Sequence, residues 1–183
     1  AAKIARLSRG TLESVESGKE RSPMIVLALD TSTDMLACAL VRMEGRAVEV
    51  LSSCDHMCRR MANVELVSTC KEALAAADLA MADLDAVLVG RGPGSFTGVR
   101  IGIATAKGLA CGASLPLYGA SALDAMAWSA HAAGVRGTLA VAGDAMRGEV
   151  YPGIYRQDEA GAHRTFVAET VVQADSGGAE WAA

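Results

Sequence analysis

The segment that most constrains the fold is an apolar run, a glycine-rich loop and a long run of small residues in direct succession. Residues 86–89 are apolar, and the loop from Gly90 to Ser95 reads Gly-Arg-Gly-Pro-Gly-Ser. Glycine and proline at this density end a strand and form a turn, and serine is a frequent N-cap of a helix. The pattern therefore predicts a strand over 85–90 and a helix over 96–112.

The loop itself leaves two interpretations open. It lacks the Gly-Lys-Ser/Thr ending of a phosphate-binding P-loop, the glycine spacing of a dinucleotide fingerprint and the surroundings of a nucleophile elbow. A helix N-terminus after glycines can still bind an anion, and the residues available for that purpose are Gly92, Gly94, Ser95, Thr97 and Arg100. The alternative is a tight strand-to-helix turn without a ligand.

The helix after the loop carries a stripe of small residues, Gly98, Gly102, Ala106 and Ala110. Residues four apart lie on one helix face, and glycine inside a helix costs about 1 kcal/mol relative to alanine. Two such glycines indicate that another backbone approaches this face closely. The neighbour is either the chain's own sheet or a helix of a second protein.

Composition limits the function classes. The 183 residues carry a net charge of -4, so the chain by itself is not expected to bind nucleic acid. Five cysteines at irregular spacing, without a C-x-x-C motif, favour a reducing cytoplasm. The segment from Cys54 to Cys58 can be read as a metal site or as an ordinary strand end, and we predict no metal because no second ligand cluster has zinc spacing.

Apolar runs separated by turns predict three strands followed by a helix, a strand, a helix, a strand and a helix. The predicted strands cover 24–29, 35–42, 47–54, 85–90 and 115–118, and the predicted helices cover 62–77, 96–112 and 121–133. A capping box from Ser121 to Asp124 is expected to open the last helix. This order is that of the ribonuclease H-like fold, which forms the duplicated lobes of actin, Hsp70 and sugar kinases. We therefore predict an α/β protein whose mixed sheet has helices on both faces.

A weak internal repeat indicates a second lobe. Residues 25–42 align without gaps to residues 139–156, with Asp30 opposite Asp144. We predict a flexible tail or linker over 1–23, an N-terminal lobe over 24–118 and an incomplete, truncated C-terminal lobe over 119–183. Because the chain starts with alanine, it is expected to be a fragment, a processed chain or part of a fusion.

In the duplicated fold a nucleotide lies between the lobes, and residues at the ends of strands hold its magnesium and phosphates. The residues at the corresponding places here, which could form a vestigial nucleotide cleft, are Asp30, Thr31, Ser32 and Asp144. The turn after Asp30 lacks the glycine of the usual Asp-x-Gly-Ser/Thr form. Asp30 can equally cap a buried strand by bonding to its own turn. The enzymatic alternative is an ATP-dependent phosphotransferase or hydrolase of this fold.

The segment from Gly90 to Lys107 closely resembles the signature of the TsaB (YeaZ) family, which is related to TsaD within the glycoprotease, or M22-like, superfamily. Residues 29–33, 82–85 and 144–151 fit the same family, and the resemblance covers residues 24–157. The catalytic relative carries a metal-binding histidine pair on its first helix. Residues 59–65 contain no histidine, so the resemblance implies neither a bound metal nor intrinsic catalysis here.

The resemblance implies a partner subunit for tRNA modification. Such a protein supports a TsaD-type transferase, together with a TsaE-type ATPase, in forming N6-threonylcarbamoyladenosine at position 37 of tRNAs that read A-starting codons. The resemblance implies that tRNA is contacted only through the complex, and that any ATP and magnesium belong to the assembled complex. It also implies a cytoplasmic protein that can form a homodimer and does not bind a membrane. Pairing through the N-lobe helices would use the residues Gly98, Gly102, Ala106, Ala110, Leu66 and Cys70.

Overall fold

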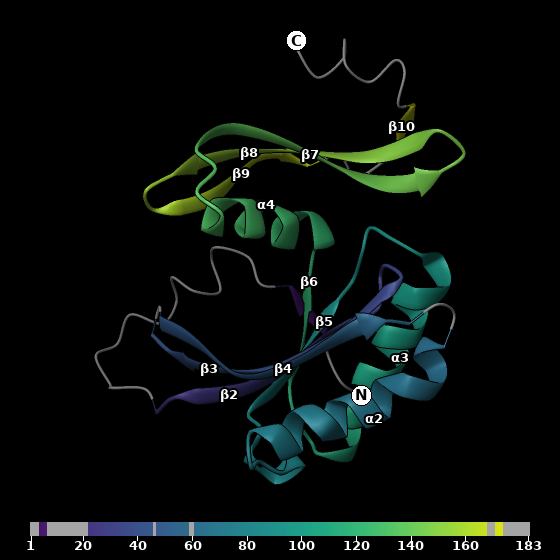
Figure 1. The fold of residues 1–183 in the computed structure, drawn as a ribbon, viewed down its shortest axis with the longest axis vertical. Helices are drawn as coiled ribbons and strands as arrows, with labels where there is room; N and C mark the ends of the chain where they lie inside the picture. Colours follow the sequence, from purple (N-terminus) through teal and green to yellow (C-terminus); the bar gives the residue numbers. More distant parts are fainter. Residues whose placement is uncertain (1–3, 7–21, 46, 59–60, 168–170, 174–183) are drawn as a thin grey trace. The chain divides into compact units, whose positions relative to one another are not determined.

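The computed structural model describes residues 4–6, 22–45, 47–58, 61–167 and 171–173 (Figure 1). These residues group into two compact units. The first unit contains the residues up to 91 together with 95–120, and the second contains 92–94 together with the residues from 121 onward. The boundary predicted between residues 118 and 119 stays a prediction, and each unit is described by itself.

The first unit is built on a six-stranded mixed sheet. Its strands, in chain order, are β1 (Ile4–Arg6), β2 (Met24–Asp30), β3 (Met35–Glu44), β4 (Ala47–Met57), β5 (Ala86–Gly90) and β6 (Leu117–Ala120), and their order across the sheet is β1-β6-β5-β2-β3-β4. β2, β3 and β4 form the predicted antiparallel meander, whereas β1, β5 and β6 join β2 in parallel. The predicted α/β fold is confirmed.

The central strand β2 fixes the register of this sheet. Leu27 pairs with Leu40 of β3 on one side and with Val87 of β5 on the other. All three side chains are fully buried. Because side chains alternate along a strand, Leu29 faces the same way as Leu27, and both belong to the main core.

Two long helices, α2 (Ala62–Ala76) and α3 (Phe96–Gly112), cover one face of this sheet, and a short 3-10 helix, η1 (Met81–Asp83), precedes β5. The two helices contact each other, with α2 against β3 and β4 and α3 against β5 and β2 (Figure 1). Helices on both faces of the sheet were expected, but the long helices described in the first unit lie on the same face. The sequence order predicts the helices but not which face each crossover takes.

The tail predicted over 1–23 lies mostly outside the described residues. Within it, Ile4–Arg6 forms β1, which pairs in parallel with β6 from Leu117 to Gly119. The flexible tail or linker over 1–23 stays a prediction. A strand this short has no readable period of its own, and its place depends on the unpaired edge that β6 offers.

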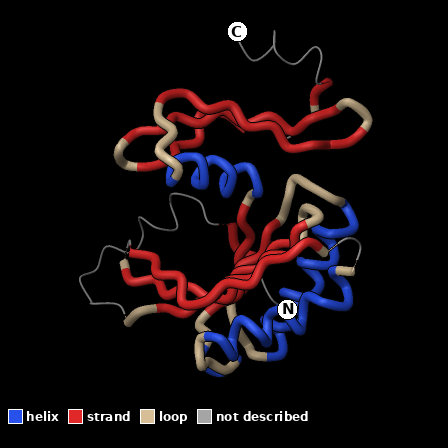
Figure 2. The backbone as a smooth tube through the Cα atoms, in the orientation of Figure 1, coloured by secondary structure: helices blue, strands red, loops and turns tan. Residues whose placement is uncertain are grey.

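The second unit consists of a helix packed on an antiparallel sheet. Its elements are α4 (Ala122–Ala132), β7 (Gly137–Met146), β8 (Glu149–Asp158), β9 (Gly161–Val167) and β10 (Val172–Gln173). β8 pairs with β7, β9 and β10 (Figure 2). Leu123 and Ala127 of α4 pack with Val141 of β7 and Tyr155 of β8 to form its core.

The capping box predicted at Ser121 does not form, because Ser121 makes no side-chain cap hydrogen bond. Asp124 turns instead toward the sheet, where its Oδ1 accepts a hydrogen bond of 2.8 Å from the Tyr155 hydroxyl and its carboxylate pairs with Arg164. Burial, followed by the hydrogen bond to Asp124, raises the pKa of Tyr155. The acidic residue of the sequence motif thus joins the helix to β8 and β9.

The two segments that align in the sequence both form antiparallel hairpins, β2–β3 and β7–β8. Their registers differ by one residue, because Asp30 pairs with Ala37 whereas Asp144 pairs with Val150 rather than Tyr151. Residues 31–34 connect the first pair, but only residues 147 and 148 connect the second, both with positive φ. Positive φ at both central residues is typical of a tight type I′ turn.

Candidate functional site

The turn after β2 forms its own closed hydrogen-bond set. The Oδ1 atom of Asp30 accepts hydrogen bonds from the Ser32 backbone N–H at 2.7 Å and from the Ser32 hydroxyl at 2.6 Å. Thr31 and Ser32 are both buried. This is the capping arrangement that the sequence left open for Asp30, so the carboxylate oxygen is used to hold the turn.

The turn docks on the first half of α3. The Thr31 hydroxyl donates to the Gly98 carbonyl at 2.7 Å, and the Ser95 N–H donates to the Ser32 carbonyl at 2.6 Å. A Cβ atom on Gly98 would lie 2.0 Å from the Thr31 carbonyl oxygen, and one on Gly102 would lie 2.5 Å from the Thr31 hydroxyl. The two glycines are therefore needed because the β2–β3 turn contacts the helix backbone.

The small-residue stripe consequently faces the chain's own sheet. Gly102, Ala106 and Ala110 are the buried residues of α3. Leu66 and Cys70 of α2 are 1% and 2% exposed in the same core. Within this chain these residues are packed in the core, and Gly98 is half-buried; that they and Gly98 contact a partner stays a prediction. Of the two interpretations of the stripe, internal packing is the one observed.

The glycine loop leads directly into α3, as predicted. The Ser95 hydroxyl accepts a hydrogen bond of 3.2 Å from the Gly98 N–H, which confirms Ser95 as the N-cap, and α3 has the predicted bounds. Gly92 has a φ of 82°, which favours glycine. Gly92 and Gly94 belong to the second unit and Ser95 to the first. Anion binding by this loop stays a prediction.

The exposed side of α3 begins with Phe96, which is 74% exposed. The guanidinium of Arg100 lies 5.2 Å from the centre of the Phe96 ring, a cation–π distance. Thr97, Arg100, Ile101 and Ala104 line an open hollow of about 340 Å³ on the same helix. This surface combines apolar area with a single positive charge.

The remaining residue of the predicted nucleotide cleft, Asp144, lies on β7 in the second unit. The structure therefore brings Asp30, Thr31 and Ser32 together, and a cleft shared with Asp144 stays a prediction. Among the described residues, no helix is long and apolar enough to cross a membrane.

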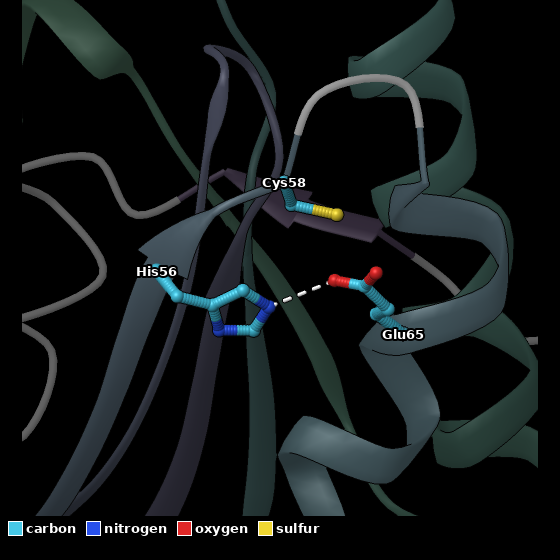
Figure 3. A group of neighbouring side chains, drawn as sticks. All are labelled: His56, Cys58 and Glu65. Atoms are coloured by element: carbon cyan, nitrogen blue, oxygen red, sulfur yellow. Dashed lines mark hydrogen bonds and ion pairs between the residues drawn. The ribbon is translucent and has the colours of Figure 1, made fainter.

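A group that the sequence recognised only in part lies where β4 meets α2. His56, Cys58 and Glu65 have ligand atoms within 4.8 Å of one another, and Nε2 of His56 lies 2.9 Å from Oε2 of Glu65 (Figure 3). Hydrogen bonds from Cys58 and from His56 lower the pKa of Glu65. Cys54, which the sequence placed in the same candidate segment, is not part of the group. The sequence alone did not indicate Glu65 as the third member, because only the folding of α2 against β4 brings it to the end of the strand.

Two further thiols meet in the core. The Sγ atoms of Cys38 on β3 and Cys70 on α2 lie 3.7 Å apart, and both residues are buried. The hydrogen bond to Cys70, together with burial, raises the pKa of the Cys38 thiol. This pair is a packing contact between α2 and the sheet.

Comparison with known proteins identifies the family. The family model described as "TsaD: tRNA N6-adenosine threonylcarbamoyltransferase" matches residues 56–173. The tRNA threonylcarbamoyladenosine biosynthesis protein TsaB of Escherichia coli (strain K12) is 38% identical over 138 residues, which cover 75% of this chain and 58% of that protein. The protein of the same name from Bacillus subtilis (strain 168) is 37% identical over 136 residues, covering 73% and 56%.

Solved structures point to the same family. A crystal structure described as an uncharacterized protein with similarity to peptidase YEAZ, from Pseudomonas aeruginosa, superimposes with a TM-score of 0.72 at 32% identity, covering 82% of this chain and 67% of that one. YeaZ from Pseudomonas aeruginosa gives a TM-score of 0.68 at 34% identity, covering 81% and 66%. The chain spans little more than half the length of the curated relatives it matches. On the matched family model, these relatives and the shared fold, the chain belongs to the TsaB (YeaZ) family.

Proposed function

We propose that this chain is a non-catalytic partner subunit in the formation of N6-threonylcarbamoyladenosine at position 37 of tRNAs that read A-starting codons. The observation that carries the proposal is the match to relatives named for threonylcarbamoyladenosine biosynthesis over about three quarters of the chain. The direct partner in this proposal is a TsaD-type transferase. A TsaE-type ATPase, with ATP and magnesium, joins in the assembled complex.

The state of the Asp30 turn supports a binding role rather than catalysis. One carboxylate oxygen of Asp30 is occupied by two hydrogen bonds within the turn, and Thr31 is committed to the α3 backbone. A side chain that closes its own turn is less available to position a metal or a phosphate. The residues that match the nucleotide site of the fold therefore act structurally in this proposal.

The partner surface in this proposal is the outward side of α2 and α3 instead of their buried stripe. The two helices pack against each other, so their exposed sides can form one surface. On α2, Val64 and Val67 are 62% and 43% exposed, and on α3 Phe96 and Ala104 are exposed. Exposed apolar side chains that gather on adjacent helices are typical of a protein-binding surface.

The remaining features of the proposal follow from charge and from this surface. The net charge of -4 makes the chain a poor ligand for a polyanion, so it contacts tRNA only through the complex. Two copies of the chain can use the same helix surface to form a homodimer, in competition with the transferase. The proposed location is the cytoplasm, where tRNA is modified.

The test is to measure binding of the purified chain to a TsaD-type transferase from the same organism by sedimentation or calorimetry. We expect association at micromolar concentration, and we expect Val64→Glu to weaken it more than tenfold because a charge would be buried in an apolar interface, at a cost of about 2 kcal/mol or more. Val50→Glu is the matched control, since Val50 is 61% exposed and lies on β4 rather than on α2 or α3.

Two outcomes would contradict this proposal. The first is no association at micromolar concentration, which would remove the partner role. The second is equal weakening by Val64→Glu and Val50→Glu, which would place the contact elsewhere. Calorimetry with magnesium and ATP on the chain alone tests the enzymatic alternative, which would gain support from nucleotide binding that Asp30→Ala abolishes.

A further inference from the structure

The junction of β4 and α2 brings three metal-ligating side chains together (Figure 3). His56 lies next to the last residue of β4 and Cys58 directly follows the strand, and a spacing of two in extended chain directs both side chains to the same side. Glu65 lies in the first turn of α2 and faces them. We propose that His56, Cys58 and Glu65 form a binding site for a divalent transition metal ion, with Zn²⁺ as the best-fitting ion. This inference is independent of the proposed partner role.

The ligand set and its spacing fit zinc. Zinc binds cysteine sulfur at about 2.3 Å, histidine nitrogen at about 2.0–2.1 Å and carboxylate oxygen at about 2.0–2.2 Å, so tetrahedral ligands lie roughly 3.3–3.6 Å from one another. The His56–Glu65 pair, at 2.9 Å, needs to open slightly, and the thiol, within 4.8 Å, needs to approach. Thiolate and imidazole together favour zinc over magnesium or calcium, which prefer oxygen ligands.

The surroundings hold two of the ligands in place and leave room for solvent. Cys58 is 6% exposed, and its N–H donates to the Asp34 carbonyl at 2.8 Å. The N–H of Glu65 bonds to the Met61 carbonyl at 3.1 Å, which fixes its place in the first helical turn. The side chains of His56 and Glu65 are 43% and 37% exposed. Three protein ligands with an open side match a zinc site whose fourth position is taken by water.

The competing explanation is an ordinary histidine–carboxylate pair with a thiol beside it. The second unit supplies a comparison, because Nε2 of His163 lies 2.9 Å from Oδ1 of Asp158. That pair repeats the imidazole and the carboxylate at the same distance. If the histidine–carboxylate pair alone captured metal, both places would bind; the proposal requires that Cys58 makes the difference.

The experiment titrates Zn²⁺ into the full chain, reduced and freed of metal, in competition with a coloured chelator. We expect one Zn²⁺ per chain, and we expect Glu65→Gln and His56→Gln each to weaken binding more than about tenfold, since even the loss of an outer partner costs about that much. His163→Ala, and Cys111→Ser at an exposed thiol on α3, should leave the affinity unchanged. Co²⁺ should give a thiolate charge-transfer band that Cys58→Ser removes.

Stability gives a second readout, because an ion that binds the folded chain raises its melting temperature. Zn²⁺ should raise the melting temperature of the unaltered chain and of His163→Ala, but not that of Glu65→Gln. Glu65 is partly exposed, so this variant is expected to fold even if Cys58→Ser does not, which circular dichroism checks. No binding, equal binding by Glu65→Gln, or loss of binding in Cys111→Ser would each overturn the proposal.

Discussion

Replacing Gly98 by alanine tests why α3 carries glycines. In an open helix position this change stabilises a protein, because alanine is a better helix former by about 1 kcal/mol. At Gly98 the added Cβ would lie 2.0 Å from the carbonyl oxygen of Thr31, whereas ordinary contacts begin at 3.4 Å. We expect the opposite sign, a loss of stability.

The magnitude follows from three contributions. Overpacking against a fixed neighbour costs about 1–3 kcal/mol, and the Thr31 backbone is fixed because its turn is held by the Asp30–Ser32 hydrogen bonds. Moving the helix away also weakens the Thr31 hydrogen bond to Gly98, worth about 1 kcal/mol. The better helix propensity of alanine offsets about 1 kcal/mol of this destabilisation. The expected net loss is therefore about 2 kcal/mol.

Gly108→Ala is the matched control, because Gly108 lies on the same helix and a Cβ there would meet nothing within 4 Å. It is expected to stabilise the protein by up to about 1 kcal/mol. The assay is urea unfolding of the full chain, with amide hydrogen exchange of β2 as a readout local to the first unit. If Gly98→Ala were as stabilising as Gly108→Ala, the close contact between the turn and α3 would be refuted.

Three smaller predictions concern single interactions. Ser95→Ala should cost about 1 kcal/mol in urea unfolding, because the N-cap of α3 is lost. Tyr155→Phe should cost about 1–2 kcal/mol in the same assay, because it removes the hydroxyl that bonds to the Asp124 carboxylate; no change would show that this bond contributes nothing. His163→Ala should raise the pKa of Asp158, measured by NMR titration, because the hydrogen bond from His163 is the main cause of its lowering. The stabilisation linked to that lowering is present above the ordinary pKa of Asp158 and is lost as the pH falls through the lowered value; an unmoved pKa would contradict this reasoning.

The local elements were predictable because the chain marks them strongly. Gly90 and Ser95 bracket the loop, and α3 begins and ends where the sequence predicted. Apolar runs gave the β2–β3–β4 meander and the helix α2 to within a few residues. These signals are local, since turn residues, caps and hydrophobic periods act on neighbouring residues.

What could not be predicted depended on which distant groups meet. A stripe such as Gly98 and Gly102 reads the same whether its neighbour is the chain's own turn or another protein, and only the fold shows that Thr31 fills it. By its spacing Asp124 belonged to a capping motif, but its carboxylate instead accepts a hydrogen bond from Tyr155, which lies 31 residues away in the sequence. In the same way, Glu65 joins His56 and Cys58 only once α2 folds back on β4.

Reconstitution of tRNA modification tests the central claim most directly. The threonylcarbamoyladenosine content of an A-starting-codon tRNA is measured after incubation with a TsaD-type transferase, a TsaE-type ATPase, ATP, magnesium and the activated threonylcarbamoyl donor, with and without this chain. The partner role predicts no modification by the chain alone and a higher rate when it joins the transferase, with the gain reduced by Val64→Glu. Modification by the chain alone, or a transferase rate that the chain leaves unchanged, would contradict that role.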